Sequence, residues 1–264
     1  MEFVDQLNRT VTFTHIPSRI ISLVPSQTEL LVALGLRKNI VGVTKFCVHP
    51  KDLRKEKTIV GGTKQVDFEK IKSLKPDIII CNKEENSEEI VLQLENVAPV
   101  WVSDITTISE SIEMILQLGK IFEVDGRALE ITANIKLKLE GFKEYVRDFP
   151  SKKVLYLIWK NPYMAAGKNT FIDELLQINN FENIIIKKNS RYPEVSIELI
   201  KTAELVLLST EPYPFKKVDA NVLAEELNSE VKLVDGEFFS WYGSRLIKAF
   251  EYFNIAAISE YADI

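Results

Sequence analysis

The sequence predicts an α/β fold with two Rossmann-like lobes, each built on a parallel sheet, joined by one long backbone helix. Three observations predict it: short apolar runs alternate with helical patterns, one helix–strand–loop unit occurs in each half, and a long helical pattern lies between the halves. Strands that alternate with helices at this spacing form parallel βαβ units. We expect an N-terminal lobe at 1–123, a linking helix at 124–150 and a C-terminal lobe at 151–264.

The first half consists of short apolar runs separated by helical patterns. Ser26 and Glu29 have the spacing of a capping box, so we expect a helix to open there. Short apolar runs bounded by polar residues indicate strands, and longer periodic segments indicate helices. In this half we expect strands at 19–24, 40–43, 58–60, 77–81 and 99–103, and helices after Pro25, after Asp67, at 88–95 and at 108–122.

The second half restarts the same alternation. We expect strands at 153–158, 183–186, 204–208 and 231–234, because each is a short apolar run. A helix is expected near 171–177, and a final helix from about Ser244. The run 235–243 mixes polar and aromatic residues, and we expect it to be a loop.

One unit of the sequence occurs in two similar copies. Residues 66–73 lead into the apolar run 77–81 and a polar loop at 82–86, and residues 195–202 lead into 204–208 and a polar loop at 209–213. Open α/β sheets bind ligands beyond the carboxyl ends of their strands. Two such lobes therefore predict a ligand held in a cleft between them. Chance likeness between two βα units is the alternative, since such units share apolar patterns.

The segment between the halves has the pattern of one long helix that ends before Pro150. About 24 helical residues would extend roughly 36 Å, which is close to the length of a domain. One apolar stripe contains Ala128, Ile131, Ile135, Leu139, Phe142 and Val146, and a second contains Leu129, Leu137 and Tyr145. Two stripes favour a helix packed against both lobes, and a surface helix with extra apolar residues is the alternative.

Composition excludes several classes of protein. Hydrophobic residues make up 46% and charged residues 27% of the 264 residues, which is typical of a globular protein. The net charge of −5 argues against a nucleic-acid-binding surface. No apolar stretch approaches the roughly 20 residues that cross a bilayer, so we expect no membrane span. Two histidines, His15 and His49, leave few options for a histidine-based catalytic triad.

Loops after the predicted strands are rich in aromatic and polar residues. Aromatic faces with interspersed polar groups suit a planar, partly polar ligand. Solvated loops also collect such residues, and this alternative stays open. The predicted ligand-facing residues are Lys45, Phe46, Cys47, His49, Gly62, Thr63, Lys64, Lys83, Glu84, Asn86, Trp159, Tyr163, Lys168, Arg191, Tyr192, Tyr213, Trp241, Tyr242 and Arg245.

Two further pairs are candidates for specific roles. Cys47 and His49 lie two residues apart, and a thiolate with an imidazole could bind a metal, the alternative being a packed thiol beside a hydrogen-bonded histidine. Glu69 and Glu198 stand at matching places in the repeated unit. One acid per lobe could dock onto basic residues of a two-fold partner, and ordinary surface glutamates are the alternative.

Four sequence runs resemble one family through nearly the whole chain: 19–30, 74–80, 161–163 with 167–168, and 192–196. They are similar to ABC-transporter substrate-binding proteins with a rigid backbone helix, the class III proteins for cobalamin, haem and iron-siderophores. The last two runs look more like the cobalamin branch. Where that branch carries tryptophans, this chain has Lys64, Asn82 and Tyr192, so a more polar or anionic ligand stays open.

The resemblance implies a non-catalytic binding component of an ABC importer, which captures cobalamin, another corrinoid, haem or a ferric siderophore between its lobes. It implies no required cofactor, a monomer, and a permease that Glu69 and Glu198 would contact. It implies a periplasmic or cell-surface location. Residues 1–6 show no basic segment followed by an apolar one. A cytoplasmic protein that reuses the fold as a corrinoid or metal carrier, or as an enzyme on a small polar substrate, is the alternative.

Overall fold

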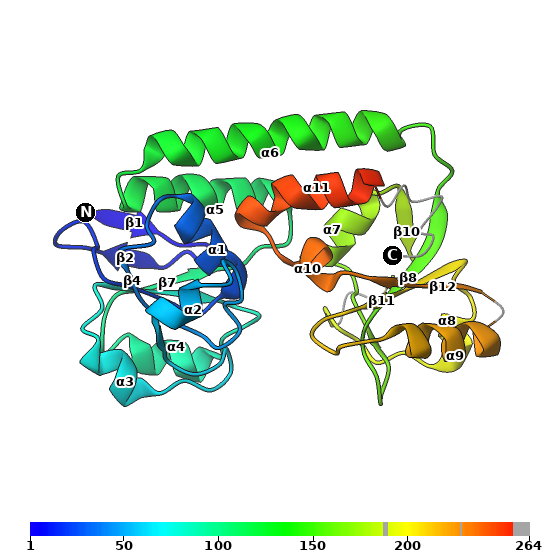
Figure 1. Cartoon of the computed structure of the whole chain (residues 1–264), viewed down its shortest axis with the longest axis horizontal. Helices are drawn as coiled ribbons and strands as arrows, with labels where there is room; N and C mark the ends of the chain where they lie inside the picture. Colours follow the sequence, from blue (N-terminus) through cyan, green and yellow to red (C-terminus); the bar gives the residue numbers. More distant parts are fainter. Residues whose placement is uncertain (187–189, 228, 256–264) are drawn as a thin grey trace. The chain divides into compact units, whose positions relative to one another are not determined.

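The computed structural model describes residues 1–186, 190–227 and 229–255, so the end of the predicted C-terminal lobe lies outside the described residues. The chain forms two compact units. Unit 1 contains residues 1–105, 109–135 and 242–245, and unit 2 contains 106–108, 136–241 and the segment from 246. Helix α6 (Asp125–Val146) contributes residues to both units (Figure 1). The three-part division at 123/124 and 150/151 stays a prediction.

Unit 1 is built on a five-stranded sheet in which every neighbouring pair is parallel. Helices α3 and α4 cover one face, where Ile71, Ile90 and Leu94 pack against strand residues such as Ile79 and Cys81. The strand order is β5 (Thr58–Ile59), β4 (Ile40–Val43), β3 (Ile20–Ser22), β6 (Ile78–Asn82), β7 (Val100–Ser103). The helices are α1 (Pro25–Ala33), α2 (Leu53–Glu56), α3 (Phe68–Ser73), α4 (Glu88–Leu94), α5 (Ile108–Ile121) and the 3-10 turn η1 (Gly243–Arg245).

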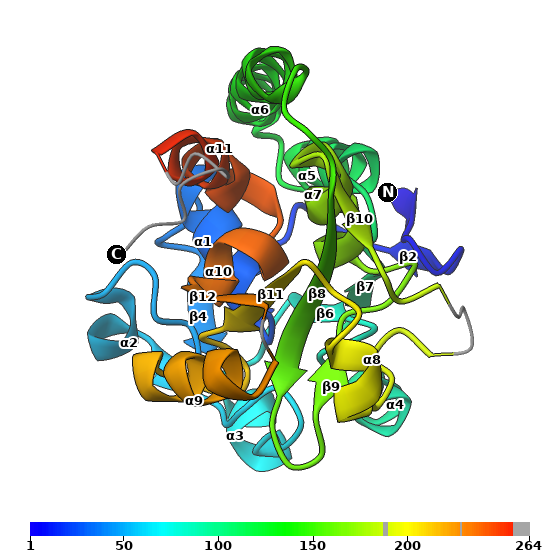
Figure 2. The ribbon, with the colours of Figure 1, turned by 90° about the vertical axis from the view of Figure 1, so that its right-hand side faces the viewer.

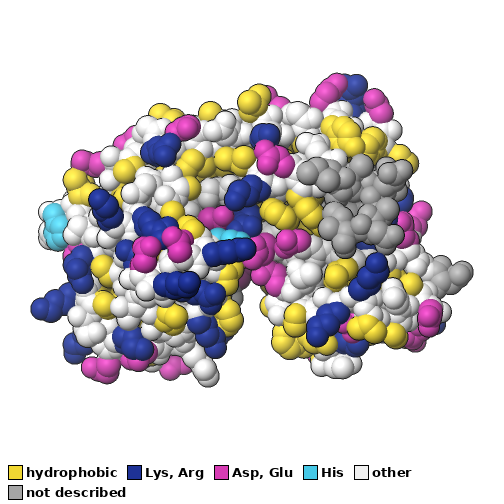
Figure 3. Space-filling model, viewed as in Figure 1, with side chains coloured by type: hydrophobic (Ala, Val, Ile, Leu, Met, Phe, Trp, Pro, Cys, Tyr) yellow, Lys and Arg dark blue, Asp and Glu magenta, His cyan; other side chains and the backbone are white. Residues whose placement is uncertain are grey.

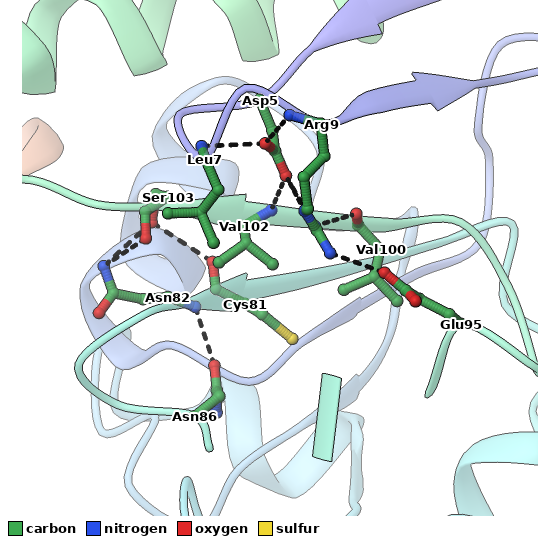
Figure 4. A network of polar contacts seen from close by, with 10 residues as sticks. All are labelled: Asp5, Leu7, Arg9, Cys81, Asn82, Asn86, Glu95, Val100, Val102 and Ser103. Atoms are coloured by element: carbon green, nitrogen blue, oxygen red, sulfur yellow. Dashed lines mark hydrogen bonds and ion pairs between the residues drawn. The ribbon is translucent and has the colours of Figure 1, made fainter. Parts of the chain in front are cut away.

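A hairpin of β1 (Glu2–Val4) and β2 (Thr10–Thr12) is attached to the outermost strand, β7. The Asp5 carboxylate accepts from the backbone N–H of Val102 at 3.2 Å and pairs with the Arg9 guanidinium at 2.6 Å. Arg9 donates in turn to the carbonyl oxygen of Val100 at 2.9 Å and to Glu95 at 2.6 Å (Figure 4). The hairpin side chains therefore satisfy backbone groups on the open side of β7.

Unit 2 is built on a second parallel sheet, to which the short β9 adds an antiparallel strand. Helices α8 and α9 cover one side of β8 and β11, and α7 and α10 lie on the other (Figure 2). The strand order is β10 (Phe181–Asn183), β8 (Lys152–Trp159), β11 (Leu205–Ser209), β12 (Glu230–Val234), with β9 (Met164–Ala165) beside β8. The helices are α7 (Phe171–Ile178), α8 (Ile197–Ile200), α9 (Lys217–Leu227), α10 (Gly236–Ser240) and α11 (Leu246–Ile255).

The repeated sequence unit occupies the same place in each sheet. β6 lies between β3 and β7, and β11 lies between β8 and β12. The helix before each of these strands has a side-chain cap: Asp67 accepts from the backbone N–H of Lys70 at 3.0 Å, and Ser196 accepts from that of Leu199 at 3.3 Å. The predicted α/β class with two parallel sheets is confirmed.

Three local predictions are wrong, and one helix was not predicted. Helix α1 begins at Pro25 after Val24, and no side chain caps it, so Ser26 is a residue of the first turn and not the cap. The strand expected at 183–186 is β10, which ends at Asn183. The loop expected at 235–243 contains α10, because Asp235 accepts from the backbone N–H of Glu237 at 3.0 Å and caps a short helix. Helix α9 is an element that the sequence patterns did not predict.

The second apolar stripe of α6 is exposed. Leu129 and Leu137 are 59% and 67% exposed and Tyr145 is 41% exposed, whereas the first stripe contains the buried Ala128 and Phe142. Hydrophobic side chains also reach the surface at other places, among charged ones (Figure 3). α6 therefore has one buried face, and the apolar residues of the second stripe lie on the surface. The buried face contributes residues to both units, which agrees with a helix packed against both lobes, but through the first stripe alone. None of the helices in the described ranges is long and apolar enough to cross a membrane.

Candidate functional site

The carboxyl edge of the unit 1 sheet carries a buried polar network. Gln27, in the first turn of α1, donates from Nε2 to Ser103 Oγ and, at 3.0 Å, to the hydroxyl oxygen of Tyr242. Asn82, the last residue of β6, donates from Nδ2 to Ser103 Oγ at 3.1 Å (Figure 4). All four side chains are buried, and burial raises the pKa of the Tyr242 phenol. The network connects the ends of β6 and β7 to α1.

Asn86 holds the loop after β6 against the loop after β5. Its Oδ1 accepts from the backbone N–H of Asn82 at 2.9 Å, and its Nδ2 donates to the carbonyl oxygen of Thr63 at 2.9 Å. Asn86 is 2% exposed. The predicted residue Asn86 therefore has a structural role in this edge, because both ends of its amide are bonded within unit 1.

Two predicted lysines contact neighbouring loops while their side chains stay exposed. Lys64 donates from Nζ to the carbonyl oxygen of Glu84 at 2.6 Å. Lys83 pairs with Asp104 at 2.7 Å. The structure thus brings Thr63, Lys64, Lys83 and Glu84 together at the rim of unit 1, as expected for loops at the carboxyl edge of one parallel sheet.

The loop after β4 contributes an exposed aromatic ring beside a cation. Phe46 is 49% exposed, and Lys45 Nζ lies 5.1 Å from the centre of its ring. Gly62 lies beneath it, because a Cβ at this glycine would be 3.2 Å from the Phe46 ring. Phe46, Lys45 and Gly62 therefore belong to one surface of unit 1.

Cys47 is fully buried, whereas His49 in the same loop is half-buried. The thiol lies 3.1 Å from Thr28 Oγ1 and 3.3 Å from Thr44 Oγ1. Burial raises the pKa of the Cys47 thiol, which disfavours the thiolate that binds metals. In residues 1–186, 190–227 and 229–255, no three His, Cys, Asp or Glu side chains form a group that could hold a metal ion. Metal binding by Cys47 and His49 stays a prediction, and the geometry favours the packed thiol.

The segment Tyr242–Arg245 is anchored inside unit 1. Beside the Tyr242 hydroxyl contact, the backbone N–H of Gly243 donates to Ser111 Oγ at 3.0 Å, and Arg245 pairs with Glu29 at 2.8 Å. Arg245 is 5% exposed and Tyr242 is 6% exposed. Both side chains are bonded within unit 1, and their predicted contact with the ligand stays a prediction.

The carboxyl edge of unit 2 carries a row of aromatic rings. Trp159, at the end of β8, lies edge-on to Tyr213 with ring centres 5.6 Å apart, and Tyr213 lies edge-on to Phe215 at 4.7 Å. Trp159 is 41% exposed. Tyr163 is half-buried against the same cluster, and burial raises the pKa of its phenol. Exposed aromatic faces of this kind suit a planar ligand.

Lys168, Arg191 and Tyr192 lie in two adjoining segments of unit 2. The backbone N–H of Gly167 donates to the carbonyl oxygen of Arg191 at 2.8 Å, and Lys168 pairs with the buried Asp173 at 3.0 Å. Arg191 and Tyr192 are half-buried. The ammonium of Lys168 is therefore engaged within unit 2.

Glu211 is a half-buried acid in the loop after β11. Its Oε1 accepts from Ser240 Oγ at 2.7 Å and from the indole N–H of Trp241 at 2.9 Å. Burial raises the pKa of Glu211, and the nearby acids Glu237 and Asp235 raise it further. The predicted Trp241 is 8% exposed and is held by this carboxyl group.

Glu69 and Glu198 occupy matching positions, each the second residue of a capped helix and each exposed. A hydrogen bond from its own backbone N–H and one from Ser196 lower the pKa of Glu198, which keeps it charged at neutral pH. A helix N-terminus also favours negative charge. Each unit therefore presents one exposed acid at an equivalent place.

Sequence patterns missed Gln27 and did not select Glu211 from its loop. Gln27 lies inside a helical pattern, where a polar residue is usually solvated. A signal was present for both: each follows a strand of a parallel sheet within a few residues, and that position places a side chain at the carboxyl edge.

Comparison with known proteins agrees with this architecture. The model of the periplasmic binding protein family matches residues 20–228. An ABC transporter substrate-binding lipoprotein of Bacillus subtilis is 27% identical over 259 residues, which cover 94% of this chain and 82% of the relative. The vitamin B12-binding protein of Photorhabdus laumondii is 25% identical over 238 residues, covering 89% and 86%.

Solved structures share the fold. The periplasmic haem-binding protein of Pseudomonas aeruginosa has a TM-score of 0.80 at 22% identity and covers 94% of each chain. The periplasmic vitamin B12-binding protein of Vibrio cholerae has a TM-score of 0.76 at 22% identity, covering 92% of this chain and 98% of that one. The family resemblance stated from the sequence is confirmed. With its family model matching residues 20–228, the chain belongs to the periplasmic binding protein family.

Proposed function

We propose that this protein is the ligand-binding component of an ABC importer and that it captures a corrinoid or another metal chelate. The observation that carries the proposal is family membership over residues 20–228, together with relatives named as a transporter lipoprotein and as vitamin B12-binding proteins. These relatives are binding proteins, which supports a binding role and not a catalytic one. We also propose that the protein is exported and acts outside the cytoplasm, in the periplasm or at the cell surface.

The geometry of each unit supports a ligand that is planar and partly polar. Unit 1 offers Phe46 with the cations of Lys45 and Lys64, and unit 2 offers the exposed ring of Trp159 beside Tyr213. Aromatic faces contribute contact area, and a few polar groups orient the ligand. Cobalamin, cobinamide, haem and ferric siderophores all have extended ring or chelate surfaces of this kind. None of them is required as a cofactor for folding in this proposal.

Equilibrium dialysis against cyanocobalamin, dicyanocobinamide, haem and a ferric siderophore tests the proposal. We expect at least one to bind with a dissociation constant in the micromolar range or below, and we expect Trp159→Ala to weaken it about tenfold through loss of one stacked ring. Leu92→Ala, which removes an exposed apolar side chain of α4, is the matched control and should leave affinity unchanged. Absence of binding to all four ligands at micromolar levels would contradict the proposal.

We further propose that Glu69 and Glu198 contact the permease. Their equivalent exposed positions at helix N-termini support this role. In cells that carry the cognate importer, Glu69→Ala with Glu198→Ala should abolish uptake of the bound ligand while dialysis shows unchanged affinity. Glu88→Ala is the control, because Glu88 is also an exposed glutamate in the first turn of a capped helix. Normal uptake by the double variant would exclude these two acids as the docking residues.

A further inference from the structure

Glu211, an acid of unit 2, has only one of its two carboxyl oxygens engaged. Both donors, Ser240 Oγ at 2.7 Å and Trp241 Nε1 at 2.9 Å, bond to Oε1. Oε2 has no hydrogen-bond partner among the described residues. The residue belongs to the loop that follows β11, so the carboxyl group lies at the edge of the sheet where ligands bind in open α/β folds.

The surroundings of Glu211 make its charge costly. The charges that act on it from α10 are those of Asp235 and Glu237, and both are negative. The groups that bond to it, a serine hydroxyl and an indole N–H, are neutral. Partly burying a carboxylate without a cation is unfavourable, and such groups are often kept where a function needs them.

The backbone next to Glu211 leaves room for its side chain. Gly236, the first residue of α10, has no side chain, and a Cβ there would lie 2.6 Å from Glu211 Cγ and closer still to Ser209 Oγ. The backbone N–H of Gly236 donates to Thr210 Oγ1 at 2.9 Å, which holds the start of α10 against the loop after β11. Glu211 therefore has a fixed position that is set by packing on two sides.

We propose that Glu211 selects the ligand by its peripheral groups. Its Oε2 accepts a hydrogen bond from an N–H or O–H group at the edge of the ligand and repels a carboxylate at the same place. This inference rests on the proposed function and names the ligand class more closely: a planar chelate with peripheral amides, and not one with peripheral carboxylates. The exposed ring of Trp159, which contacts Tyr213 in the same loop as Glu211, would stack on such a chelate.

Two ligands with the same corrin ring separate these possibilities. Dicyanocobinamide carries amides on the ring, and dicyanocobyrinic acid carries carboxylates in their place. At pH 7.5, the wild-type protein should bind the amide form about tenfold more tightly or better, since a hydrogen bond to a charged group is replaced by repulsion. Isothermal titration calorimetry of both ligands measures this ratio.

Glu211→Gln is the decisive variant. Glutamine has the same shape, keeps an oxygen for Ser240 and Trp241, and removes a half-buried charge, so folding should be preserved. The ratio of the two dissociation constants should fall about tenfold, towards one. Glu237→Gln is the matched control, because it removes a neighbouring acid of α10 without altering the Glu211 carboxyl group, and it should change the ratio less than twofold.

The outcomes are distinct. If the wild-type protein binds neither corrinoid, this inference is overturned, and so is the proposal that the ligand is a corrinoid. Binding of corrinoid with a ratio that Glu211→Gln leaves unchanged overturns this inference alone, and the proposed function stands. An equal fall of the ratio in Glu237→Gln would show that general negative charge, and not the Oε2 contact, discriminates between the ligands.

Discussion

At the scale of single residues, Asp5 shows how one buried carboxylate organises a region. It has no exposed side-chain surface, and it bonds to Arg9, to two backbone N–H groups of its own turn and to Val102 on the edge strand. Removing the cation would leave Asp5 buried with only neutral donors.

Arg9→Ala should therefore lower the free energy of unfolding by about 2–3 kcal/mol. Urea denaturation followed by circular dichroism measures the loss. Arg127→Ala is the control: Arg127 pairs with Glu130 on the surface, where both side chains are more than half exposed, so it should cost under about 0.5 kcal/mol. Equal effects of the two substitutions would show that the Asp5 network contributes no more than a surface pair.

Glu211 should make stability depend on pH. In the unfolded chain its pKa is about 4.3, and burial raises it in the folded state. Between these two values the folded protein retains a proton that the unfolded chain has lost, so this residue's contribution to stability declines as pH rises through the window. Glu211→Gln, which does not titrate, should gain stability relative to wild type over this window and match it most closely below pH 4.

A series of urea denaturation curves from pH 3.5 to pH 8 would measure this difference. Glu225→Gln, at an exposed position on α9, is the control variant. A flat curve for Glu211→Gln would contradict the raised pKa.

Residue types at the ends of strands predicted where the candidate site lies better than they predicted which of its side chains are exposed. Trp159, Phe46 and Lys64 do reach the edges of their sheets. Cys47, Asn86 and Arg245 are buried, and their polar atoms bond to α1 or to the loop after β5; ligand contact by these residues stays a prediction. Periodicity and composition carry no information on which polar side chains will be bonded within the protein, since that depends on contacts between distant segments.

At the scale of elements, the apolar strands were predictable because a strand buried on both faces has a continuous apolar run. Helix α9 was not, because it has a mixed surface in which Val218 and Val222 are 61% and 58% exposed. Helix α10 was not predicted because its short sequence contains two aromatic residues and no helical pattern. The aspartate at its cap is a clearer sign of a helix than the pattern of its side chains.

The caps of the repeated helices give a prediction at this scale. Asp67→Ala and Ser196→Ala should each destabilise the protein by about 1 kcal/mol, because each leaves a backbone N–H of the first turn without its acceptor. Thermal unfolding by calorimetry would measure both. Ser26→Ala does not test capping, since Ser26 is not at the cap position and its buried hydroxyl bonds to Tyr242. Unchanged stability of Asp67→Ala and Ser196→Ala would contradict the role of the two cap hydrogen bonds.

At the scale of the whole molecule, α6 makes each unit depend on residues beyond the simple halves of the chain. Unit 1 includes the buried Ala128 and Ile135 of α6, and also the segment Tyr242–Arg245, whose side chains bond to Gln27 and Glu29. In unit 2, Phe142 of α6 packs against Phe250 and Phe253 of α11, with ring centres 5.9 and 5.7 Å apart.

A fragment that ends at residue 123 should therefore fail to fold cooperatively, because it lacks the α6 side chains and the segment that pairs with α1. Near-ultraviolet circular dichroism and urea denaturation should show no sharp transition. A fragment of residues 1–135, mixed with a synthetic peptide of residues 238–249, is the comparison and should recover part of the signal. A stable, cooperative fragment 1–123 would show that the predicted lobe boundary defines an independent domain.

The contacts that Asp5 and Arg9 make with β7 affect how the protein behaves in crowded solution. β7 is the last strand of its sheet, and its outward amide and carbonyl groups would otherwise be free to recruit a strand from another molecule. By occupying Val100 and Val102 with side chains, the N-terminal hairpin removes the template on which a fibril could grow.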